Sequence, residues 1–516
     1  MKQVWLGSIV AALVGLASCG SGSADSAAQG KDGKSAAAGS LVEPEAVAAS
    51  DLKAAVSDER VRKFYEDRDW RTAWTAQSAS ALLDALQGAG RHGLAPHDYL
   101  GPVDEADTPA KREAALTRAA LDFAGALAHG KLDPTTVFDI YTIPRPQVDV
   151  VGGLEQAIAA GNTAKWLDSL APHDPQYRAL SQAFLDYSRQ AAKAGGQGIE
   201  SGDLIHAGES DPRVPRIVQV LQDNGYLAPD SGSQADLYTQ QIADAVERMQ
   251  QDFGIVTDGV VGPDTLEVLN TGPAQRARIL AVNLERLRWL ERNPPATRID
   301  VNTAAATLDY FRDGTLRDER KVIVGQPGWE TPHLQAPMFR LVANPTWTVP
   351  KSIEKEEIPN SASYLRRHNM ERRNGWIVQL PGPDNALGQV KFDMQDDYAI
   401  YLHDTPAKSL FERNQRQLSH GCVRVDNALQ FARMIAEDAG VAQQYQEARA
   451  SGDETFVRLP DNIPVRLLYE TAFTDGSGKV RFRTDPYGWD DRIAEKLGYE
   501  PHSRRRLQSH VSDIGP

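Results

Sequence analysis

Cysteine is nearly absent from this sequence, because only Cys19 and Cys422 occur among its 516 residues. No HExxH motif and no Cys/His cluster with zinc spacing is present either, so we expect neither a metal nor another cofactor. The triplet "GKS" at Gly33 lacks the glycine that a phosphate-binding loop requires five residues earlier. These absences exclude the common zinc sites and the common nucleotide-binding loop.

Positive charge is also scarce, since the formal net charge is −14. A general nucleic-acid binder needs a basic surface, so this class is disfavoured, as is electrostatic adhesion to anionic membranes. Apolar residues make up 41% and charged residues 24%, which is typical of soluble globular domains. A chain of this length exceeds one hydrophobic core, and about two to four domains are expected.

The N-terminus, "MKQVWLGSIVAALVGLASC", has one lysine and then an apolar run that ends in small residues. It predicts a secretion signal over residues 1–19, and the run is too short for a membrane-spanning helix. The ending "LASC" resembles a lipobox, in which Cys19 carries the lipid that anchors the protein; a plain signal peptide is the alternative. Residues 20–50 are rich in Gly, Ser and Ala, as in a flexible tether. With Cys19 modified, Cys422 is the only free thiol, and in an oxidising compartment this has to be explained.

Two helical regions follow the tether. Over residues 51–200, Leu, Ala and Phe recur at three- and four-residue spacing, which predicts a helical domain. Four aromatic residues near its start could bind sugar faces, although core packing fits their spacing better: Phe64, Tyr65, Trp70 and Trp74. Residues 203–272 contain short helical patterns and the turn "DGVVGPDT". They resemble the three-helix peptidoglycan-binding module at Phe253, Gly254, Asp258, Gly259, Gly262 and Thr265, or form a spacer that has lost the ligand.

The second half of the chain has a different texture. An amphipathic helix is predicted over residues 273–296. From 297 to 475, short β-branched or aromatic runs are divided by Gly, Pro and Asp, which predicts a mainly β domain. Residues 344–374 interrupt these strands with a basic, helix-like sequence. They form either a lid over a site or a surface loop.

Cys422 lies in "SHGCVR", beside residues that suit nucleophilic catalysis. A cysteine nucleophile acts as thiolate, so a neighbour must lower its pKa or accept its proton. His420 would share a face with Cys422 on an extended segment, but the intervening Gly421 suggests a turn. His403, 19 residues before Cys422 at the end of "YAIYLH", is favoured as the base, because adjacent strand ends would bring the two together.

Three neighbours of the thiol have predicted uses. Without a side chain, Gly421 lets a substrate carbonyl approach the N–H groups of Gly421 and Cys422, which are natural oxyanion donors. Asp426 or Asn427 would cap the helix that follows, whose dipole would slightly help the thiolate. Arg424 would bind a substrate carboxylate or form a salt bridge within the fold.

"SHGCVR" after "YLHDTP" resembles the signature of L,D-transpeptidases with a YkuD-type catalytic domain. Further segments resemble the large YcbB-like branch of that family: "FYEDRDWRTAW", "GLAPHDY", "NPTWTVP" and "TDPYGWDDRIAEKLG". The resemblance implies a multi-domain α+β fold. A helical scaffold domain, a small three-helix peptidoglycan-binding-like module and a mainly β catalytic domain with a capping insertion would make it up. A C-terminal segment, residues 476–516, would pack on the scaffold.

The resemblance also implies residue roles. Cys422 would be the acylated nucleophile and His403 its base, while Tyr401 and the Gly421 backbone would help to form the oxyanion site. The side chains implied to shape the pocket and hold the peptide are Ser419, His420, Arg424 and Trp347.

The implied reaction is acyl transfer in the cell wall. Cys422 would attack the third residue of a tetrapeptide stem, release D-Ala, and pass the acyl group to the diaminopimelate amine of a second stem as a 3→3 cross-link. The implied partners are peptidoglycan stem peptides, a membrane reached through lipid on Cys19, and other cell-wall synthesis proteins. We expect a periplasmic protein anchored to the outer membrane, because Gly20 is not the Asp that signals inner-membrane retention.

Several alternatives stay open. The same thioester would serve an L,D-carboxypeptidase, or an enzyme that cleaves or forms the amide between lipoprotein and peptidoglycan. A lipid-anchored peptidoglycan-binding tether without activity is disfavoured by the intact Cys422 and His403. A merely buried cysteine would explain neither His403 nor Gly421. Papain-type peptidases place Cys before His in the chain, and the order here is the reverse.

Overall fold

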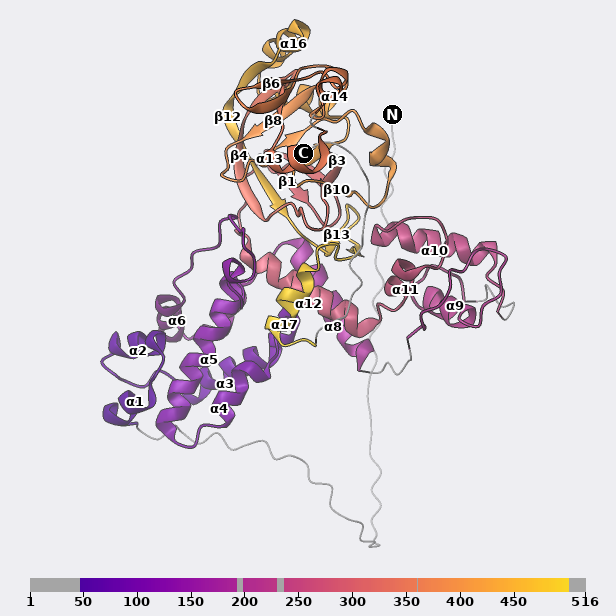
Figure 1. The fold of residues 1–516 in the computed structure, drawn as a ribbon. Coiled ribbons are helices and arrows are strands. Elements are labelled where there is room, and N and C mark those ends of the chain that lie inside the picture. The colour runs from indigo at the N-terminus through magenta and orange to yellow at the C-terminus, as the bar shows by residue number, and fades with distance from the viewer. Residues whose placement is uncertain (1–46, 193–197, 230–235, 360, 501–516) are drawn as a thin grey trace, which may run out of the picture. The chain divides into compact units, whose positions relative to one another are not determined.

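Helices make up the first half of the described chain, and strands dominate the second half (Figure 1). The computed structural model describes residues 47–192, 198–229, 236–359 and 361–500, all of which belong to the unit Pro44–Pro516. The predicted signal, Cys19 and most of the predicted tether lie outside these residues, as does the end of the predicted C-terminal segment. No helix among the described residues combines the length and the apolar character that crossing a membrane requires.

The predicted helical domain is confirmed. Its longest helix, α5, begins with Pro109 in the first turn, and the hydroxyl of Thr108 caps it by accepting from the Lys111 N–H at 3.2 Å. The bounds are α1 Ala49–Ala55, α2 Glu59–Glu66, α3 Ala76–Gln87, α4 His97–Asp104, α5 Pro109–His129, α6 Val150–Ala159, α7 Thr163–Leu170 and α8 Pro175–Ala191, with 3₁₀ turns at Gly88–His92 and Pro134–Thr136.

The aromatic cluster of α2 and the loop after it belongs to the core. Phe64, Tyr65 and Trp74 are buried, and the Tyr65 hydroxyl lies 2.6 Å from the Thr117 hydroxyl on α5. Trp70 is half-buried and stacks on Tyr65. Core packing is therefore the correct interpretation of these aromatics.

The next module contains the helices α9 Val214–Asp223, α10 Gln240–Phe253 and α11 Pro263–Leu269. The buried Gln250 organises its turn: the amide nitrogen donates to Asp258 and to the Thr265 hydroxyl, and the amide oxygen accepts from the Gly259 N–H. Gly254 and Gly259 adopt φ of 71° and 66°, which disfavours other residues. These motif residues therefore hold the fold of the module together.

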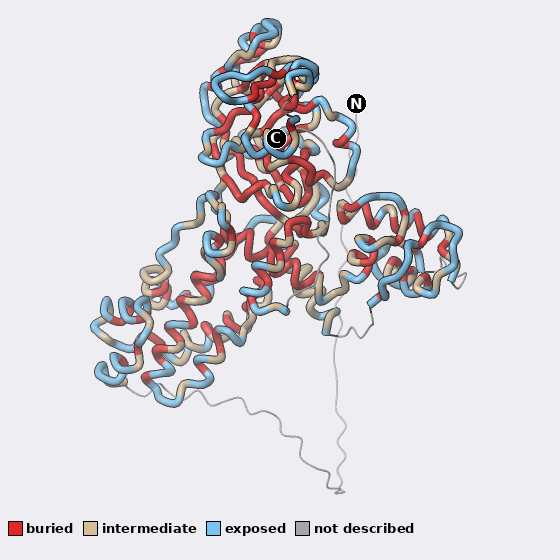
Figure 2. Tube along the Cα trace, in the orientation of Figure 1, coloured by how far each residue is buried: buried red, intermediate tan, exposed pale blue. Residues whose placement is uncertain are grey.

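Helix α12, Pro273–Trp289, differs from the amphipathic helix that the sequence predicts. Every residue from Arg276 to Trp289 is buried (Figure 2), because α5, α8, β13 and α17 all pack against this helix. Three of its arginines are tolerated inside the protein because carboxylates lie beside them. Arg278 pairs with Asp491 at 2.6 Å, Arg286 with Asp490 at 2.5 Å and Arg288 with Glu285 at 2.5 Å.

The predicted β domain contains a sheet with the strand order β10-β3-β11-β9-β8-β4-β12-β1-β2. Since β2 also pairs with β3, the sheet closes on itself. The strands are β1 Arg298–Asn302, β2 Thr307–Arg312, β3 Thr315–Gly325, β4 Leu334–Ala343, β8 Val390–Met394, β9 Leu402–His403, β10 Gln417–Ser419, β11 Val423–Val425 and β12 Thr455–Leu468. A 3₁₀ turn at Lys408–Glu412 and the helices α15 Ala428–Asp438 and α16 Ala442–Ser451 complete the domain.

The predicted insertion has a small core of its own. It contains β5 Trp347–Thr348, α13 Lys351–Glu357, α14 Ala362–Arg367, β6 Met370–Arg373 and β7 Trp376–Gln379, and the strands form a sheet in the order β5-β7-β6. Trp347, Ile353, Leu365 and Ile377 are buried together in its centre. The insertion is thus a folded subdomain and not a simple surface loop.

The chain after β12 returns to α12. It forms β13 Ala472–Thr474, β14 Val480–Phe482 and α17 Trp489–Leu497. Trp489, Ile493 and Tyr487 share one apolar cluster with Trp289 of α12. The contacts of Asp490 and Asp491 with arginines of α12 add charge pairing to this packing.

Candidate active site

The strands β9 and β11 bring the predicted site residues together. They pair in parallel, with Leu402 opposite Val423 and His403 opposite Arg424. Leu402 and Val423 point into the apolar core. Because side chains alternate along a strand, Tyr401, His403, Cys422 and Arg424 share the opposite face.

Cys422 is only 5% exposed, and its surroundings favour the neutral thiol. Burial raises its pKa from 9.0 to about 11, although the Tyr401 backbone, Lys391 and the Tyr401 side chain act in the opposite direction. The thiol donates to the Ala399 carbonyl at 3.8 Å. The helix dipole therefore does not offset the burial that favours the neutral thiol, and a nucleophilic role for Cys422 would require a base to accept its proton.

Tyr401 lies between the thiol and the insertion. Burial, followed by the nearby Cys422 thiol, raises the pKa of its phenol well above the ordinary value, so the hydroxyl stays protonated and can donate a hydrogen bond. Its ring packs against the insertion's core, which includes the buried Trp347. Lys391 lies over the ring at 4.1 Å. Trp347 therefore supports Tyr401 from the insertion side.

His403 is fully buried, and one hydrogen bond sets its tautomer. Nδ1 lies 2.5 Å from the backbone oxygen of Asp404. A carbonyl can only accept, so Nδ1 carries a proton, and Nε2 is the nitrogen that can accept a proton when the ring is neutral. Its ring centroid lies 5.7 Å from that of Tyr401, on the face that also carries Cys422. A neutral ring held in this orientation can act as a general base through Nε2.

Ser419 shapes the turn that carries Cys422. Its hydroxyl donates to the Cys422 carbonyl at 2.6 Å and accepts from the Gly421 N–H at 3.1 Å. Gly421 has φ of 111°, which a residue with a side chain rarely adopts. The Gly421 N–H already donates to Ser419. Of the two predicted oxyanion donors, the Cys422 N–H is therefore the one that makes no hydrogen bond to another described residue.

His420 faces the insertion. Its Nε2 lies 2.7 Å from the Glu357 carboxylate at the end of α13, and its ring packs edge-on against Trp329. The contact joins the residue before Gly421 to the insertion. This arrangement agrees with the preference for His403 as the base.

Arg424 and Asn427 follow Cys422 in the chain, before helix α15. Arg424 is 1% exposed and lies on the face of Cys422. Asn427 occupies the N-cap position of α15, but its φ is 48° and its side chain makes no capping hydrogen bond. The predicted side-chain cap by Asp426 or Asn427 is therefore wrong, because the backbone enters the helix through a left-handed residue.

A chain of hydrogen bonds that the sequence did not indicate supports the nucleophile turn. The Thr331 hydroxyl donates to the Gly421 carbonyl at 2.8 Å and accepts from the Gly325 N–H at 2.9 Å. The Tyr487 hydroxyl donates to the Gly325 carbonyl at 2.6 Å. Tyr487 belongs to the tail motif "TDPYGWDDRIAEKLG", but no pattern in the sequence connects that motif with Cys422.

Three family matches cover most of the described chain. Residues 296–446 match the "L,D-transpeptidase catalytic domain", which includes the whole face around Cys422. These residues form an L,D-transpeptidase catalytic domain. Residues 59–184 match the "Scaffold domain" and residues 210–269 the "Putative peptidoglycan binding domain". The predicted resemblance to L,D-transpeptidases with a YkuD-type catalytic domain and the predicted fold class are both confirmed.

One curated relative is 33% identical over 239 residues, a "Putative L,D-transpeptidase" of Haemophilus influenzae. The match spans 42% of this chain and about half (48%) of the relative. Among solved structures, an L,D-transpeptidase from Stackebrandtia nassauensis is 15% identical, with 53% of this chain and 97% of that chain covered and a TM-score of 0.23. An L,D-transpeptidase from Mycobacterium smegmatis is 14% identical, with coverages of 33% and 58% and a TM-score of 0.20. Neither of these TM-scores supports an inference about this chain.

The site offers no evident metal ligands. Among the described residues, no group of three or more His, Cys, Asp or Glu side chains is placed to hold a metal ion.

Proposed function

We propose that the protein forms 3→3 cross-links in peptidoglycan by acyl transfer through Cys422. The observation that carries the proposal is the shared face of Tyr401, His403 and Cys422, on which Tyr401 lies next to both the buried Cys422 thiol and the His403 imidazole. The substrate follows from the L,D-transpeptidase domain and the peptidoglycan-binding domain in the same chain.

The first step is acylation. His403 Nε2 takes the thiol proton as Cys422 Sγ attacks the carbonyl of the third stem residue. The Cys422 N–H and the Tyr401 hydroxyl stabilise the oxyanion that forms. The carbon–nitrogen bond to D-Ala then breaks, the His403 proton goes to the D-Ala amine, and a thioester remains on Cys422.

The second step is transfer. The side-chain amine of a diaminopimelate on another stem attacks the thioester carbonyl and gives a proton to His403. The carbon–sulfur bond breaks, the amide of the cross-link forms, and the proton returns to the Cys422 sulfur. Burial of the thiol excludes water that would otherwise compete with the amine.

The proposal is tested by incubating the protein with purified tetrapeptide muropeptides and measuring product masses. Dimers linked between third residues are expected from the wild type, and none from Cys422→Ala. Tripeptide monomers alone would mean an L,D-carboxypeptidase. With cell walls that carry bound lipoprotein as the substrate instead, release of the lipoprotein would mean an amide hydrolase. A wild type that gives no product but binds peptidoglycan would be the inactive lipid-anchored tether.

We also propose that a carbapenem adds covalently to Cys422, because its strained acyl group is open to the same attack. Intact-mass spectrometry should show one adduct on the wild type and none on Cys422→Ala. An adduct of equal yield on the alanine variant would place the reactive group elsewhere.

For location, we propose a periplasmic protein held at the outer membrane by lipid on Cys19. The support is the sequence around Cys19 and a substrate that lies outside the cytoplasm. Substituting Cys19→Ala should move the protein from the outer-membrane fraction to the soluble periplasmic fraction. Unchanged fractionation would contradict the anchor.

A further inference from the structure

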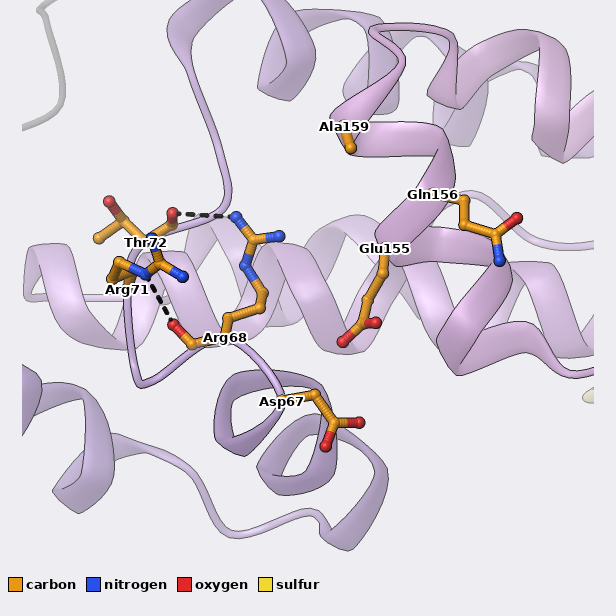
Figure 3. Close-up of a pocket in the computed structure, with 7 residues that line it drawn as sticks. All are labelled: Asp67, Arg68, Arg71, Thr72, Glu155, Gln156 and Ala159. Carbon is orange, nitrogen blue, oxygen red and sulfur yellow. Dashed lines mark hydrogen bonds between the residues drawn. The ribbon is translucent and has the colours of Figure 1, made fainter.

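A cavity in the scaffold domain lies between the loop after α2 and helix α6. It has a volume of about 570 Å³, and its lining includes four charged side chains: Asp67, Arg68, Arg71 and Glu155. Figure 3 shows the arginines and Thr72 on the loop side, and Glu155, Gln156 and Ala159 on the helix side. The loop belongs to the motif "FYEDRDWRTAW", whose aromatics pack in the core but whose arginines have no part in the proposed transpeptidase reaction.

The charges around this scaffold cavity are opposed but not neutralised by one another. Arg68 and Glu155 each have a shielded atom without a hydrogen-bond partner among the described residues, Nε of Arg68 and Oε1 of Glu155. Asp67 is paired with Lys63 at 2.6 Å, and Arg71 lies 3.7 Å from the highly exposed Asp69. The wall therefore has unmet donor capacity on one side and unmet acceptor capacity on the other.

The loop that carries the arginines is held in a defined shape. Asp69 and Trp70 have φ of 53° and 59°, in the left-handed region, and the Trp70 N–H donates to the Tyr65 carbonyl at 2.8 Å. Arg71 Nε donates to the Arg68 carbonyl at 3.0 Å, and Arg68 Nη2 donates to the Thr72 carbonyl at 3.4 Å. Stacking of Trp70 on Tyr65 fixes this loop to the core, so the backbone that carries the two arginines is already in place before a ligand binds.

The arrangement selects against single-charge ligands. A phosphate would meet the Glu155 and Asp67 carboxylates, and a divalent cation would meet two guanidinium groups. A ligand that carries one charge of each sign at opposite ends satisfies both sides. Burial, followed by the Asp67 carboxylate, raises the pKa of Glu155. A cation placed beside Glu155 would stabilise its charged carboxylate. The volume falls in the range of about 300–1,000 Å³ that is usual for small-molecule pockets, which suits a short peptide.

We infer that this cavity binds a short zwitterionic peptide, with its carboxylate on Arg68 and Arg71 and its ammonium on Glu155. Two sources share this chemistry: peptide stems of the cell wall with a free amine, and free short peptides of any sequence. None of the lining residues belongs to the catalytic domain, so the site stands or falls independently of the cross-linking reaction.

The test measures peptide binding by calorimetry on the full chain with Cys422→Ala, which prevents turnover. The first probe is trialanine, a zwitterion without stem chemistry. Arg68→Gln and Glu155→Gln should each weaken its binding at least tenfold. Two neutralised residues outside the cavity, Glu66→Gln and Arg112→Gln, are matched controls that should leave the dissociation constant within twofold.

Blocked probes test the charges without any substitution. N-acetylated trialanine and trialanine amide should each bind at least tenfold more weakly than trialanine. Tighter binding of the stem tripeptide L-alanyl-γ-D-glutamyl-diaminopimelate would identify the wall as the source, and equal binding would extend the site to short peptides in general. Blocked peptides that bind like trialanine, substitutions without effect, or a parent protein that binds neither peptide at millimolar concentration would overturn the inference.

A separate readout keeps this result apart from the proposed function. With Cys422 intact, Arg68→Gln is compared with wild type in the muropeptide assay on soluble substrate. Loss of peptide binding with normal cross-linking supports a scaffold site, whereas equal loss of both in a folded variant would contradict a site independent of the catalytic domain.

Discussion

Helix α12 and the catalytic face both bury titratable side chains, but they satisfy them in different ways. On α12, Arg278, Arg286 and Arg288 each have a carboxylate within 2.6 Å. On the candidate catalytic face, Cys422 remains a neutral thiol whose pKa is raised by burial, on the same face of the strands as His403, the proposed base. Matched charge holds a structure in place, whereas a buried group that still has a proton to lose is ready for chemistry.

The largest effect is expected from Cys422→Ala. It removes the nucleophile, so cross-linking should disappear, while the small buried side chain leaves the fold nearly unchanged. Product masses and thermal unfolding together check this. Cross-linking at the wild-type rate would refute the assignment.

A smaller but still large loss is expected from His403→Gln, which keeps hydrogen bonding but removes the base. We expect kcat/KM to fall by about 10²–10⁴-fold, the usual contribution of general-base catalysis. Steady-state kinetics with the tetrapeptide donor measure this. A drop of less than about tenfold would show that another group takes the proton.

The contrasting prediction concerns α12. Asp490→Ala leaves Arg286 as an unpaired buried charge and should destabilise the protein by about 3–5 kcal/mol. Chemical denaturation measures the change, and the fraction that stays folded should keep the wild-type kcat. The matched control is Asp186→Ala, which breaks the exposed pair with Arg189 and should cost less than about 1 kcal/mol. Similar losses in both variants would mean that α12 does not depend on its buried pairs.

The pH dependence separates the two regions further. The pKa of the Cys422 thiol in the folded protein is about 11, above the ordinary value of 9.0, so the folded state holds this proton more tightly. The stability from the thiol is therefore complete below about pH 9 and is lost as the pH rises toward 11. In a Cys19→Ser variant, alkylation by iodoacetamide should accelerate over that same interval. A rate that already levels off near neutral pH would show a preformed thiolate instead.

The smallest effect is expected from Tyr487→Phe. Tyr487 shares an apolar cluster with Trp289 of α12 and also contacts the segment behind the turn of Cys422. The substitution removes the hydrogen bond to the Gly325 carbonyl, a contribution of about 1 kcal/mol, and loosens the turn behind Gly421. We expect a reduction of kcat by severalfold with KM nearly unchanged, because the substituted residue touches no substrate. An unchanged kcat would mean that the turn holds its shape without the C-terminal segment.

The two regions also differed in how well the sequence predicted them. The site residues lie within one segment of the chain, and the parallel pairing of β9 with β11 brings their strands side by side as expected. The helix over residues 273–296 was predicted to be amphipathic, yet α12 is buried all round. Its partners Asp490 and Asp491 lie some 200 residues away, so no local periodicity indicates them.

Other features depend on long-range contacts in the same way. Pro337 and Pro464 lie opposite each other in the paired strands β4 and β12, although proline argues against a central strand. Thr331 and Glu357 reach the nucleophile turn from segments whose sequences give no sign of a catalytic role. Local chemistry was therefore predictable, whereas the contacts that position it needed the tertiary structure.

The central claim is that a peptide stem becomes attached to the sulfur of Cys422, and trapping that thioester tests it most directly. The wild type and the Cys422→Ala variant are mixed with the tetrapeptide donor without an acceptor, quenched in acid and analysed by intact-protein and peptide mass spectrometry. We expect the wild type to gain the mass of the tripeptide acyl group on the peptide that contains Cys422, and the variant to gain nothing. Cross-linked product formed with no such adduct, or an adduct on any other residue, would contradict the account.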